Sequence, residues 1–394
     1  MSTTLDPRPV TPARLAWLRT QLDSWETDGL LDDAQAAAIL DSYHPSRRFG
    51  LTGLLFSIGA IFLGFGLIWL VAVNYEHLSP AVRFGLVAGL WLALLVGGEA
   101  FHVRRSVPTA ASGAIRLLAA FAFGAVVFQA AQSLQVPAYE PALVGLWGLG
   151  ALAHAYAVGA IMPLAVGIAA SLGWYLWVVL WDSTSSLSGV LSLAVAAVVA
   201  TSLAALHERW LPRFADAWRE VGALLALTAM FWAALPFAGP GGFAWSFWLV
   251  AGLALAAGSA VAAVLLSRGT TRLEPLVAVG AGVVSVALVL WEAVGTGDGG
   301  ATLADWAQVS LAVAGYAVLA VAVAALGTLR DSWRLTALST GALVVFTTVQ
   351  SFAVFAQIIQ GAWLFVVLGL VFVTTGYLFD RARRRLARNL TEVS

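Results

Sequence analysis

The sequence predicts an all-α protein that crosses a membrane many times and carries a small helical hairpin at its N-terminus. Hydrophobic residues make up 60% of the 394 positions and charged residues only 11%, whereas soluble domains contain about 25% charged residues. Apolar runs of about twenty residues recur between residues 51 and 379, and each can cross a hydrocarbon core of about 30 Å as a helix. We therefore expect a polytopic helix bundle over residues 49–380.

Residues 1–48 form a separate polar segment, which we interpret as a cytosolic helical hairpin domain. Steps of three and four residues place one set of apolar side chains on a single helix face: Leu15, Leu18, Leu22 and Trp25. Pro12 suits the first turn of this helix, Gly29 suits its end, and Asp32 is the expected N-cap of a second helix. A segment this small buries little core by itself, so we expect it to pack on the membrane domain or on a partner.

Twelve membrane helices are expected near residues 51–73, 81–101, 114–134, 141–160, 163–181, 187–206, 218–237, 243–266, 274–294, 304–327, 335–356 and 361–379. Arginines orient such helices because they favour the cytoplasmic side. With the N-terminus in the cytoplasm, twenty of the 21 arginines fall in inner segments, and Arg83 is the exception. Both termini are then cytosolic, including a basic tail over residues 381–394 that attracts anionic lipids.

Two local features of the expected bundle depend on glycine and proline. A single helix over residues 141–181 would be about 60 Å long, so we expect a break at residues 159–163, with Pro163 starting the next helix. Glycines inside the apolar helices favour close helix packing over phosphate binding; they include Gly59, Gly64, Gly66, Gly85, Gly89, Gly145, Gly148 and Gly150.

Sequence motifs for catalysis or metal binding are missing. The chain has no cysteine, which excludes disulfides and thiolate sites, and its five histidines are dispersed. No metalloprotease motif, phosphate-binding loop or nucleophile elbow is present. We expect no enzymatic activity, no metal and no cofactor. An intramembrane enzyme is the third alternative, and it would draw on outer-side residues whose spacing is not diagnostic: Glu76, His77, Glu140 and Asp182.

Polar residues at membrane depth are the main candidates for function. Six of them gather toward the outer leaflet in the expected topology and form the predicted ligand-lining set: Asn74, Gln129, Gln132, Glu292, Gln350 and Gln357. Three interpretations stay open for the amides: a fringe at the membrane surface, hydrogen bonds between helices, or a vestibule for a ligand. The apparent lack of a buried charge pair counts against the vestibule.

Two titratable residues stand out on the inner side. Glu99 lies about one turn from Arg104, which favours a local ion pair or an interfacial carboxylate over proton transfer. His154 lies near the short inner turn, where a hydrogen-bonded structural histidine and a proton relay are both possible.

Three stretches resemble the domain-of-unknown-function 2157 family of predicted bacterial membrane proteins. They are "WETDGLLDDAQAAAILDSY" at 25–43, "GAIFLGFGLIWLVAVNYEHLSPAVRF" at 59–84 and "FQAAQSLQVPAYEPALVGLWGLGAL" at 128–152. The resemblance covers roughly residues 14–180. It implies a multi-pass inner-membrane protein with a small cytosolic N-terminal domain, and it implies no particular activity.

Transport or translocation of a small molecule or a lipid is the function that we expect first, because twelve helices can enclose a central cavity. The alternative is a scaffold or sensor that binds a protein partner through residues 1–48. Membrane lipids are the other expected partners, and nucleic acid is not expected. The sequence leaves the oligomeric state open.

Overall fold

The computed structural model describes residues 8–10, 12–45, 79–103, 109–137, 139–181, 183, 185–235, 238–291 and 303–355, and scattered single or paired positions within 55–66 and 369–381. In this part of the chain there are twelve α-helices, one 3₁₀ helix and two three-residue strands. The predicted α-helical class is confirmed. Ten of the twelve expected membrane helices fall in the described residues, and each corresponds to an observed helix; those expected at 51–73 and 361–379 lie outside them.

The N-terminal hairpin consists of α1 (Pro12–Thr27) and α2 (Asp33–Asp41). Asp32 caps α2 as expected, because its side chain accepts a hydrogen bond from the backbone of Gln35 at 2.7 Å and the Gln35 side chain returns one at 3.1 Å. Gly29 adopts a left-handed φ of 69° in the turn. Leu15 and Leu22 are buried on the expected face of α1.

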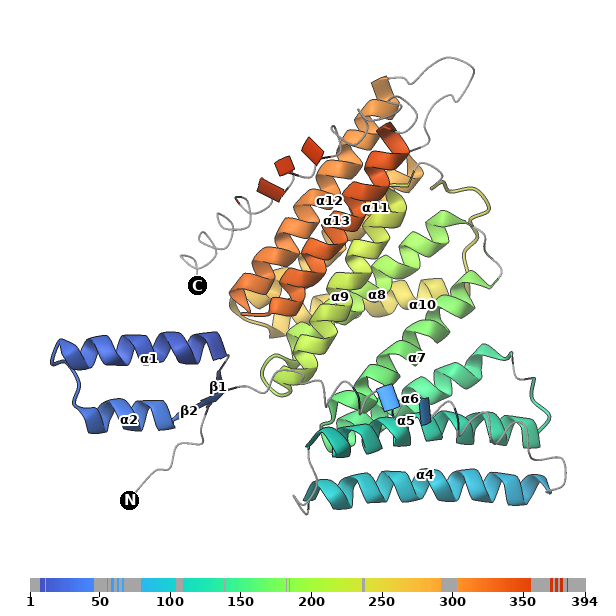
Figure 1. Cartoon of the computed structure of the whole chain (residues 1–394). Helices are drawn as coiled ribbons and strands as arrows, with labels where there is room; N and C mark the ends of the chain where they lie inside the picture. The colour runs from blue at the N-terminus through green and yellow to red at the C-terminus, as the bar shows by residue number, and fades with distance from the viewer. Residues whose placement is uncertain are drawn as a thin grey trace.

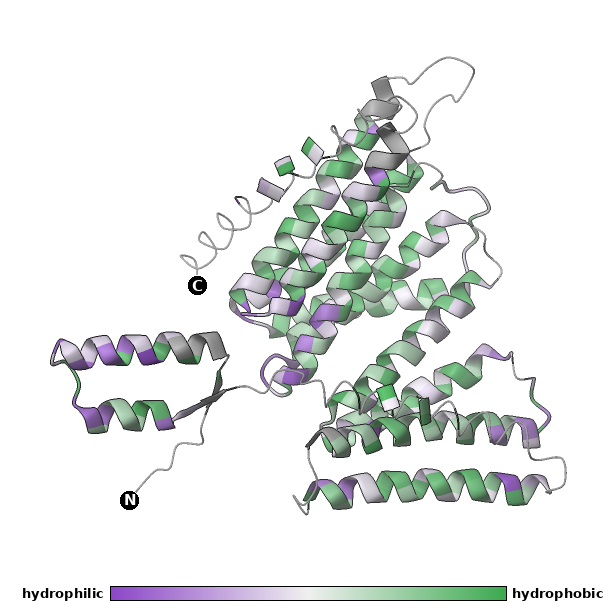
Figure 2. Ribbon diagram, in the orientation of Figure 1, coloured by the Kyte–Doolittle hydropathy of each residue, from purple (hydrophilic) through white to green (hydrophobic). Residues whose placement is uncertain are grey.

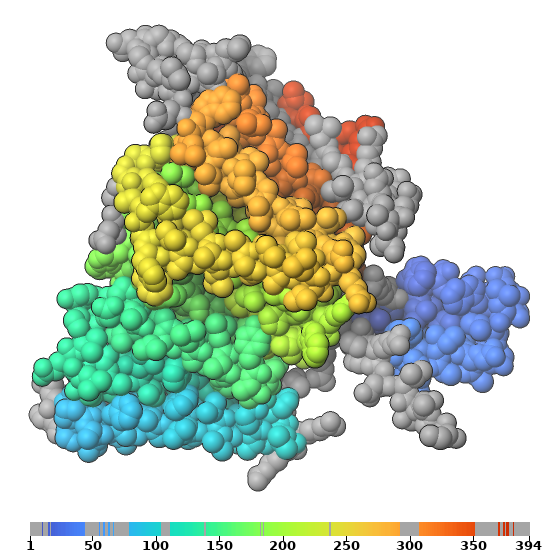
Figure 3. All heavy atoms as spheres, turned by 180° about the vertical axis from the view of Figure 1, so that it is seen from behind, coloured from blue at the N-terminus to red at the C-terminus, as the bar shows by residue number. Residues whose placement is uncertain are grey.

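A parallel pair of short strands closes this hairpin and was not predicted. β1 (Arg8–Val10) pairs with β2 (Tyr43–Pro45), with Pro9 opposite His44. The pairing fixes the start of α1 beside the end of α2. Figures 1 and 3 show these elements beside the helix bundle, in dark and mid blue.

Four helices form one group of the bundle: α4 (Pro80–Val103), α5 (Thr109–Ser133), α6 (Pro141–Val158) and α7 (Ile161–Leu180). α4 lies along α5 at the base of the bundle (Figure 1). The expected break between α6 and α7 is confirmed, since Gly159 ends α6 with a φ of 62° and Pro163 lies in the first turn of α7.

The second group comprises α8 (Ser186–His207), α9 (Pro212–Ala233), α10 (Phe247–Leu266), the 3₁₀ helix η1 (Gly269–Arg272), α11 (Leu273–Leu290), α12 (Leu303–Leu329) and α13 (Trp333–Phe355). α8 is the central element, and most of its 22 residues are buried against α9, α10 and α11. Small side chains such as Ala194, Ala197 and Ala229 allow this close approach. α7 contacts both groups.

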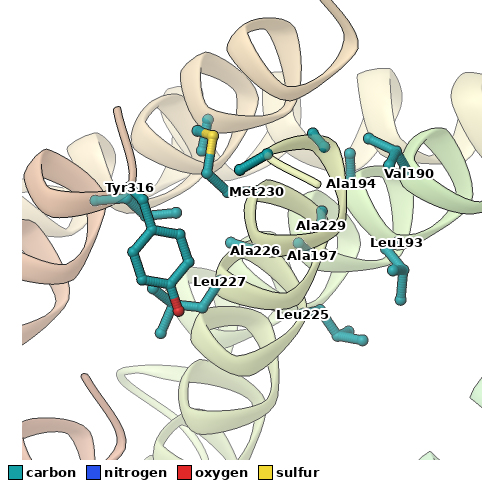
Figure 4. Packing of buried hydrophobic residues seen from close by; sticks show 14 of the residues in the cluster. Val190, Leu193, Ala194, Ala197, Leu225, Ala226, Leu227, Ala229, Met230 and Tyr316 are labelled. Atoms are coloured by element: carbon teal, nitrogen blue, oxygen red, sulfur yellow. The ribbon is translucent and has the colours of Figure 1, made fainter. Parts of the chain in front are cut away.

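The largest core cluster lies where α8, α9, α11, α12 and α13 meet (Figure 4). Tyr316 of α12 stacks on Phe346 of α13 with ring centroids 3.8 Å apart, and its hydroxyl donates to the Ala342 carbonyl at 3.1 Å. Met230 and Leu227 of α9 fill the space beside it. The hydroxyl of the buried tyrosine is therefore satisfied, and so is that of the buried Ser285 beside Met230, which donates to the Ala281 carbonyl at 2.8 Å.

Eight of the described helices are long and apolar enough to cross a membrane. α9 is not among them, because Arg213, Asp216, Arg219 and Glu220 lie within its first nine residues. Many large apolar side chains on α10 and α11 are exposed, including Leu255 and Val283. Contact with lipid accounts for such exposure in a membrane protein.

The glycine predictions are confirmed in one place and not in another. A Cβ at Gly148 would lie 2.8 Å from the Ser171 backbone nitrogen of α7, and one at Gly145 would lie 3.0 Å from the Trp174 ring. α6 therefore needs these glycines to pack. A Cβ at Gly85 or Gly89 would meet no described atom within 4 Å, so the expected close contact at the GxxxG of α4 is not found among the described residues.

Candidate functional site

Four charged side chains meet at the end of the second helix group where α8 joins α9. Figure 2 shows hydrophilic residues gathered at this end of α9, next to otherwise apolar helices. Glu208 directly follows α8, Arg219 lies on α9, Glu274 lies in the first turn of α11, and Arg330 directly follows α12. We call these four residues the charge ring.

Each carboxylate of the charge ring bridges both guanidinium groups. Arg219 donates from Nε to Oε2 of Glu274 at 2.8 Å and from Nη2 to Oε2 of Glu208. Arg330 donates from Nη1 to Oε1 of Glu208 at 2.6 Å and from Nη2 to Oε1 of Glu274 at 2.7 Å. All four carboxylate oxygens thus accept a charge-assisted hydrogen bond, and positive and negative groups alternate around a closed ring.

The inner half of the charge ring is almost completely shielded from solvent. The side chain of Arg219 is 2% exposed and that of Glu274 is 4% exposed, whereas Arg330 is 21% and Glu208 is 32% exposed. Charges buried this deeply are costly to desolvate unless they are paired. The ring is neutral as a whole, so each buried charge has its counter-charge in contact.

Further polar groups extend the charge ring toward the surface. Asp216 accepts from Nη1 of Arg219 at 3.1 Å, one turn earlier on α9. The Thr271 hydroxyl accepts from Nη2 of Arg330 at 2.7 Å. Glu220 and Arg334 form a longer and more exposed contact at 3.4 Å. Nη2 of Arg330 therefore donates to two acceptors, Thr271 and Glu274. The Glu220–Arg334 ion pair is the weaker interaction because it is longer and more exposed.

Helix ends explain how most of the charge ring is placed. Glu274 lies at the positive N-terminal end of α11, and Arg330 lies at the negative C-terminal end of α12, so both charges favour the adjacent helix dipole. Glu208 lies at the C-terminal end of α8, where the dipole disfavours a carboxylate. Contacts with two guanidinium groups offset that disadvantage.

The sequence analysis expected no buried charge pair, and the charge ring shows that this was wrong. The missed signal was positional: all four residues lie near helix ends that the arginine distribution assigns to one side of the membrane. Arg219 also has Asp216 one turn away on the same helix face. Helical periodicity alone did not reveal that these ends meet in space.

A second ion pair joins α4 to α5. Nε and Nη2 of Arg116 donate to the two carboxylate oxygens of Glu99, at 2.7 Å and 2.5 Å. Arg104, the partner expected from the sequence, lies outside the described residues. The Nε2 atom of His154 on α6 is buried and has no hydrogen-bond partner in the part of the chain that the structure describes. A fully hydrogen-bonded structural histidine is therefore not what these residues show.

The predicted ligand-lining residues fall into three sets. Gln129 of α5 and Gln350 of α13 are buried, and Gln132 of α5 is exposed. α5 and α13 belong to different helix groups and lie well apart in Figure 1. The other three residues, Asn74, Glu292 and Gln357, lie outside the described residues. Burial within protein disfavours a surface fringe for Gln129 and Gln350, and the ligand-lining role stays a prediction.

Gln308 is an amide that the sequence analysis did not single out. It lies on α12, and its Nε2 donates to the Leu288 and Trp291 carbonyls at the end of α11, both at 3.1 Å. Those carbonyls belong to the helix terminus, where backbone acceptors lack intrahelical partners. Interhelical hydrogen bonding, one of the three interpretations for amides, is thus realised at this position.

Of the four residues considered for an intramembrane enzyme, only Glu140 lies in the part of the chain that the structure describes. Glu140 is exposed at the N-cap of α6 and makes no capping hydrogen bond through its side chain. Asp182, Glu76 and His77 lie outside the described residues. No group of three histidine or carboxylate side chains among the described residues could hold a metal ion.

Comparison with protein families adds one finding. Residues 23–164 match the family model Predicted membrane protein (DUF2157). The resemblance stated from the sequence is thereby confirmed, and the DUF2157 region runs from within α1 to the first turn of α7. It includes Glu99, Arg116 and His154, whereas the charge ring lies beyond it. Neither the curated proteins nor the solved structures contain a significant match.

Proposed function

We propose that this protein carries a small molecule or a lipid across the bacterial cytoplasmic membrane, with both termini and the charge ring on the cytosolic side. The proposal includes no catalytic step, cofactor or nucleic acid. The arginine distribution supports the orientation, since the segments around the charge ring carry Arg209, Arg213, Arg268 and Arg272 as well as its own two arginines.

The charge ring is the observation that carries the proposal. Replacing a buried ion pair by apolar side chains of similar size is often neutral or stabilising. A passive membrane anchor therefore has little use for a buried arginine and a buried carboxylate that are joined to a second, partly exposed pair. Charged groups do suit helix ends that separate and close again, because each group can exchange its partner for water when the end opens.

The arrangement of the helices supports the same proposal. The charge ring joins the ends of α8, α9, α11 and α12, whereas the core between these helices carries no charged side chain and is mainly apolar among the described residues. Charge is thus concentrated at one end of the group. Opening that end would break four charge-assisted hydrogen bonds and leave most of the apolar packing intact.

Flux into proteoliposomes tests the proposal. NBD-labelled phosphatidylethanolamine reports lipid translocation, and an extract of bacterial small molecules, analysed by mass spectrometry after uptake, reports solute transport. We expect at least one class to cross faster than in protein-free vesicles and the Glu274→Gln variant to change that rate. Rates equal to those of protein-free vesicles in both assays would contradict the proposal.

A scaffold or sensor that acts through the N-terminal hairpin is the second candidate. Trp17 on α1 is 60% exposed, which is unusual for a tryptophan on a small polar domain. A protein partner that covers Trp17 would explain its exposure. Deletion of residues 1–48 separates the two candidates: unchanged flux favours transport, and loss of a co-purifying protein without any flux favours the scaffold.

A further inference from the structure

The turn between α10 and α11 carries two arginines that no carboxylate neutralises among the described residues. Arg268 is the N-cap of η1 and Arg272 is its last residue. Both are exposed, and neither forms an ion pair within the described part of the chain. Glu274, the nearest carboxylate in the sequence, is buried in the charge ring. This turn therefore presents uncompensated positive charge.

Hydrogen bonds hold the turn and Arg272 in place. Nε of Arg272 donates to the Ser267 carbonyl at 2.6 Å, and the Ser267 hydroxyl donates to the Ala205 carbonyl of α8 at 3.3 Å. Thr271 in the same turn accepts from Arg330 of the charge ring. The Nη1 and Nη2 atoms of Arg272 form no hydrogen bond with the described residues. A guanidinium that is already held through Nε loses little freedom when its terminal nitrogens bind an anion.

Exposed leucines flank the two arginines on both adjoining helices. Leu265 and Leu266 end α10 and are 73% and 68% exposed, and Leu273 and Leu276 lie in the first turn of α11 and are 48% and 50% exposed. Figure 3 shows α10, in yellow, at the surface of the molecule. Positive charge and apolar surface are thus adjacent here, as are the phosphate and the acyl chains in a phospholipid.

We propose that this turn binds an anionic phospholipid, with its phosphate on Arg268 and Arg272 and its acyl chains along the four leucines. Arginine binds phosphate through two parallel hydrogen bonds. The two arginines are four residues apart, so their Cα atoms are separated by at most about 14 Å, and both side chains can reach one headgroup. A soluble phosphate would leave the leucines uncovered, whereas a lipid covers both parts of the surface. The site requires only that the protein lies in a membrane, whether or not it transports a solute.

The turn between α8 and α9 provides a matched control. Arg209 and Arg213 are exposed there and also form no ion pair with the described residues. Trp210 is exposed between them, but no large apolar side chain is exposed on the adjoining turns of α8 and α9. This pair therefore has the same charge and lacks a surface for acyl chains.

Native mass spectrometry of the full chain in detergent measures the binding of phosphatidylglycerol and of phosphatidylcholine with the same acyl chains. We expect phosphatidylglycerol to bind more tightly. Arg268→Gln with Arg272→Gln should weaken its binding by about fivefold for each arginine removed. Arg209→Gln with Arg213→Gln should leave the binding unchanged. All four positions are exposed, and circular dichroism checks that each variant keeps its helices.

Two further measurements separate a lipid site from a soluble-anion site. Leu266→Gln with Leu273→Gln should also weaken the binding of phosphatidylglycerol, because the acyl chains lose apolar contacts, and sodium phosphate should not displace the lipid. Equal losses in the two arginine double variants would show diffuse attraction to basic residues and would overturn the proposal. Displacement by sodium phosphate, full affinity in the leucine variant, or equal binding of the two lipids would overturn it as well.

Discussion

Replacing Glu274 by glutamine is the perturbation that best isolates the energetics of the charge ring. The carboxylate accepts from Arg219 at 2.8 Å on one oxygen and from Arg330 at 2.7 Å on the other. Glutamine keeps one acceptor, but its amide nitrogen is a donor and would face a guanidinium donor. Arg219 would remain buried with less compensating charge around it.

The expected magnitude follows from burial. The Arg219 and Glu274 side chains are 2% and 4% exposed, and removing one partner of a buried ion pair destabilises a protein by about 3–5 kcal/mol. Glu220→Gln is the matched control, because its contact with Arg334 is 3.4 Å long and its two side chains are 26% and 49% exposed. Breaking such a pair costs about 0–1 kcal/mol.

Denaturation in detergent micelles, followed by tryptophan fluorescence, measures both variants. Trp218 is buried next to Arg219 and its indole donates to the Tyr156 hydroxyl at 3.1 Å, so the signal includes the region of the charge ring. The double variant Arg219→Met with Glu274→Leu should cost less than Glu274→Gln alone, since it removes both buried charges. The reasoning is refuted if Glu274→Gln is no more destabilising than Glu220→Gln.

Three further predictions concern packing, helix termini and orientation. Gly148→Ala should destabilise the protein by about 1–3 kcal/mol, because its Cβ would meet the Ser171 backbone nitrogen at 2.8 Å; Gly258→Ala, which has no described atom within 4 Å of its Cβ, should be neutral or slightly stabilising in the same denaturation assay. Gln308→Leu should cost about 1–2 kcal/mol because two carbonyls of α11 lose their donor. Gln132→Leu, at an exposed position, should change the stability little. Equal losses of stability in Gln308→Leu and Gln132→Leu would argue that Gln308 does not stabilise the end of α11. For the orientation, single cysteines are introduced at three exposed positions, Trp210, Trp333 and Trp245. In intact cells, a membrane-impermeant maleimide should label the cysteine at Trp245 and should not label those at Trp210 and Trp333. Labelling of all three cysteines from outside would contradict the orientation.

The helices could be predicted because their signals are local. Each apolar run predicts its helix by its own length. The helix ends are set by residues within one or two turns of each other, such as Asp32 with Gln35 at the start of α2, and Gly159 with Pro163 between α6 and α7. The limits of the helices were less certain where charge enters the helix. α9 begins at Pro212 rather than near residue 218, since its first turns are polar and did not look like part of a membrane helix.

The contacts between distant segments could not be predicted in the same way. β1 pairs with β2 more than thirty residues later, and two prolines in these strands argue against strand formation by local propensity. Glu208 and Arg330 are 122 residues apart in the sequence. Periodicity shows that each lies at a helix end, but only the packing of α8, α9, α11 and α12 determines which ends meet.

Thiol accessibility at Thr271 tests most directly whether the charge ring is a closure that opens. The Thr271 hydroxyl accepts from Arg330, and the residue is buried, so a cysteine there should be protected while the ring is closed. In inside-out vesicles, we predict slow labelling of Thr271→Cys by a membrane-impermeant maleimide. Labelling should become several-fold faster when Glu274→Gln is added and should be unchanged by Glu220→Gln. Equal labelling rates in all three proteins would contradict the account.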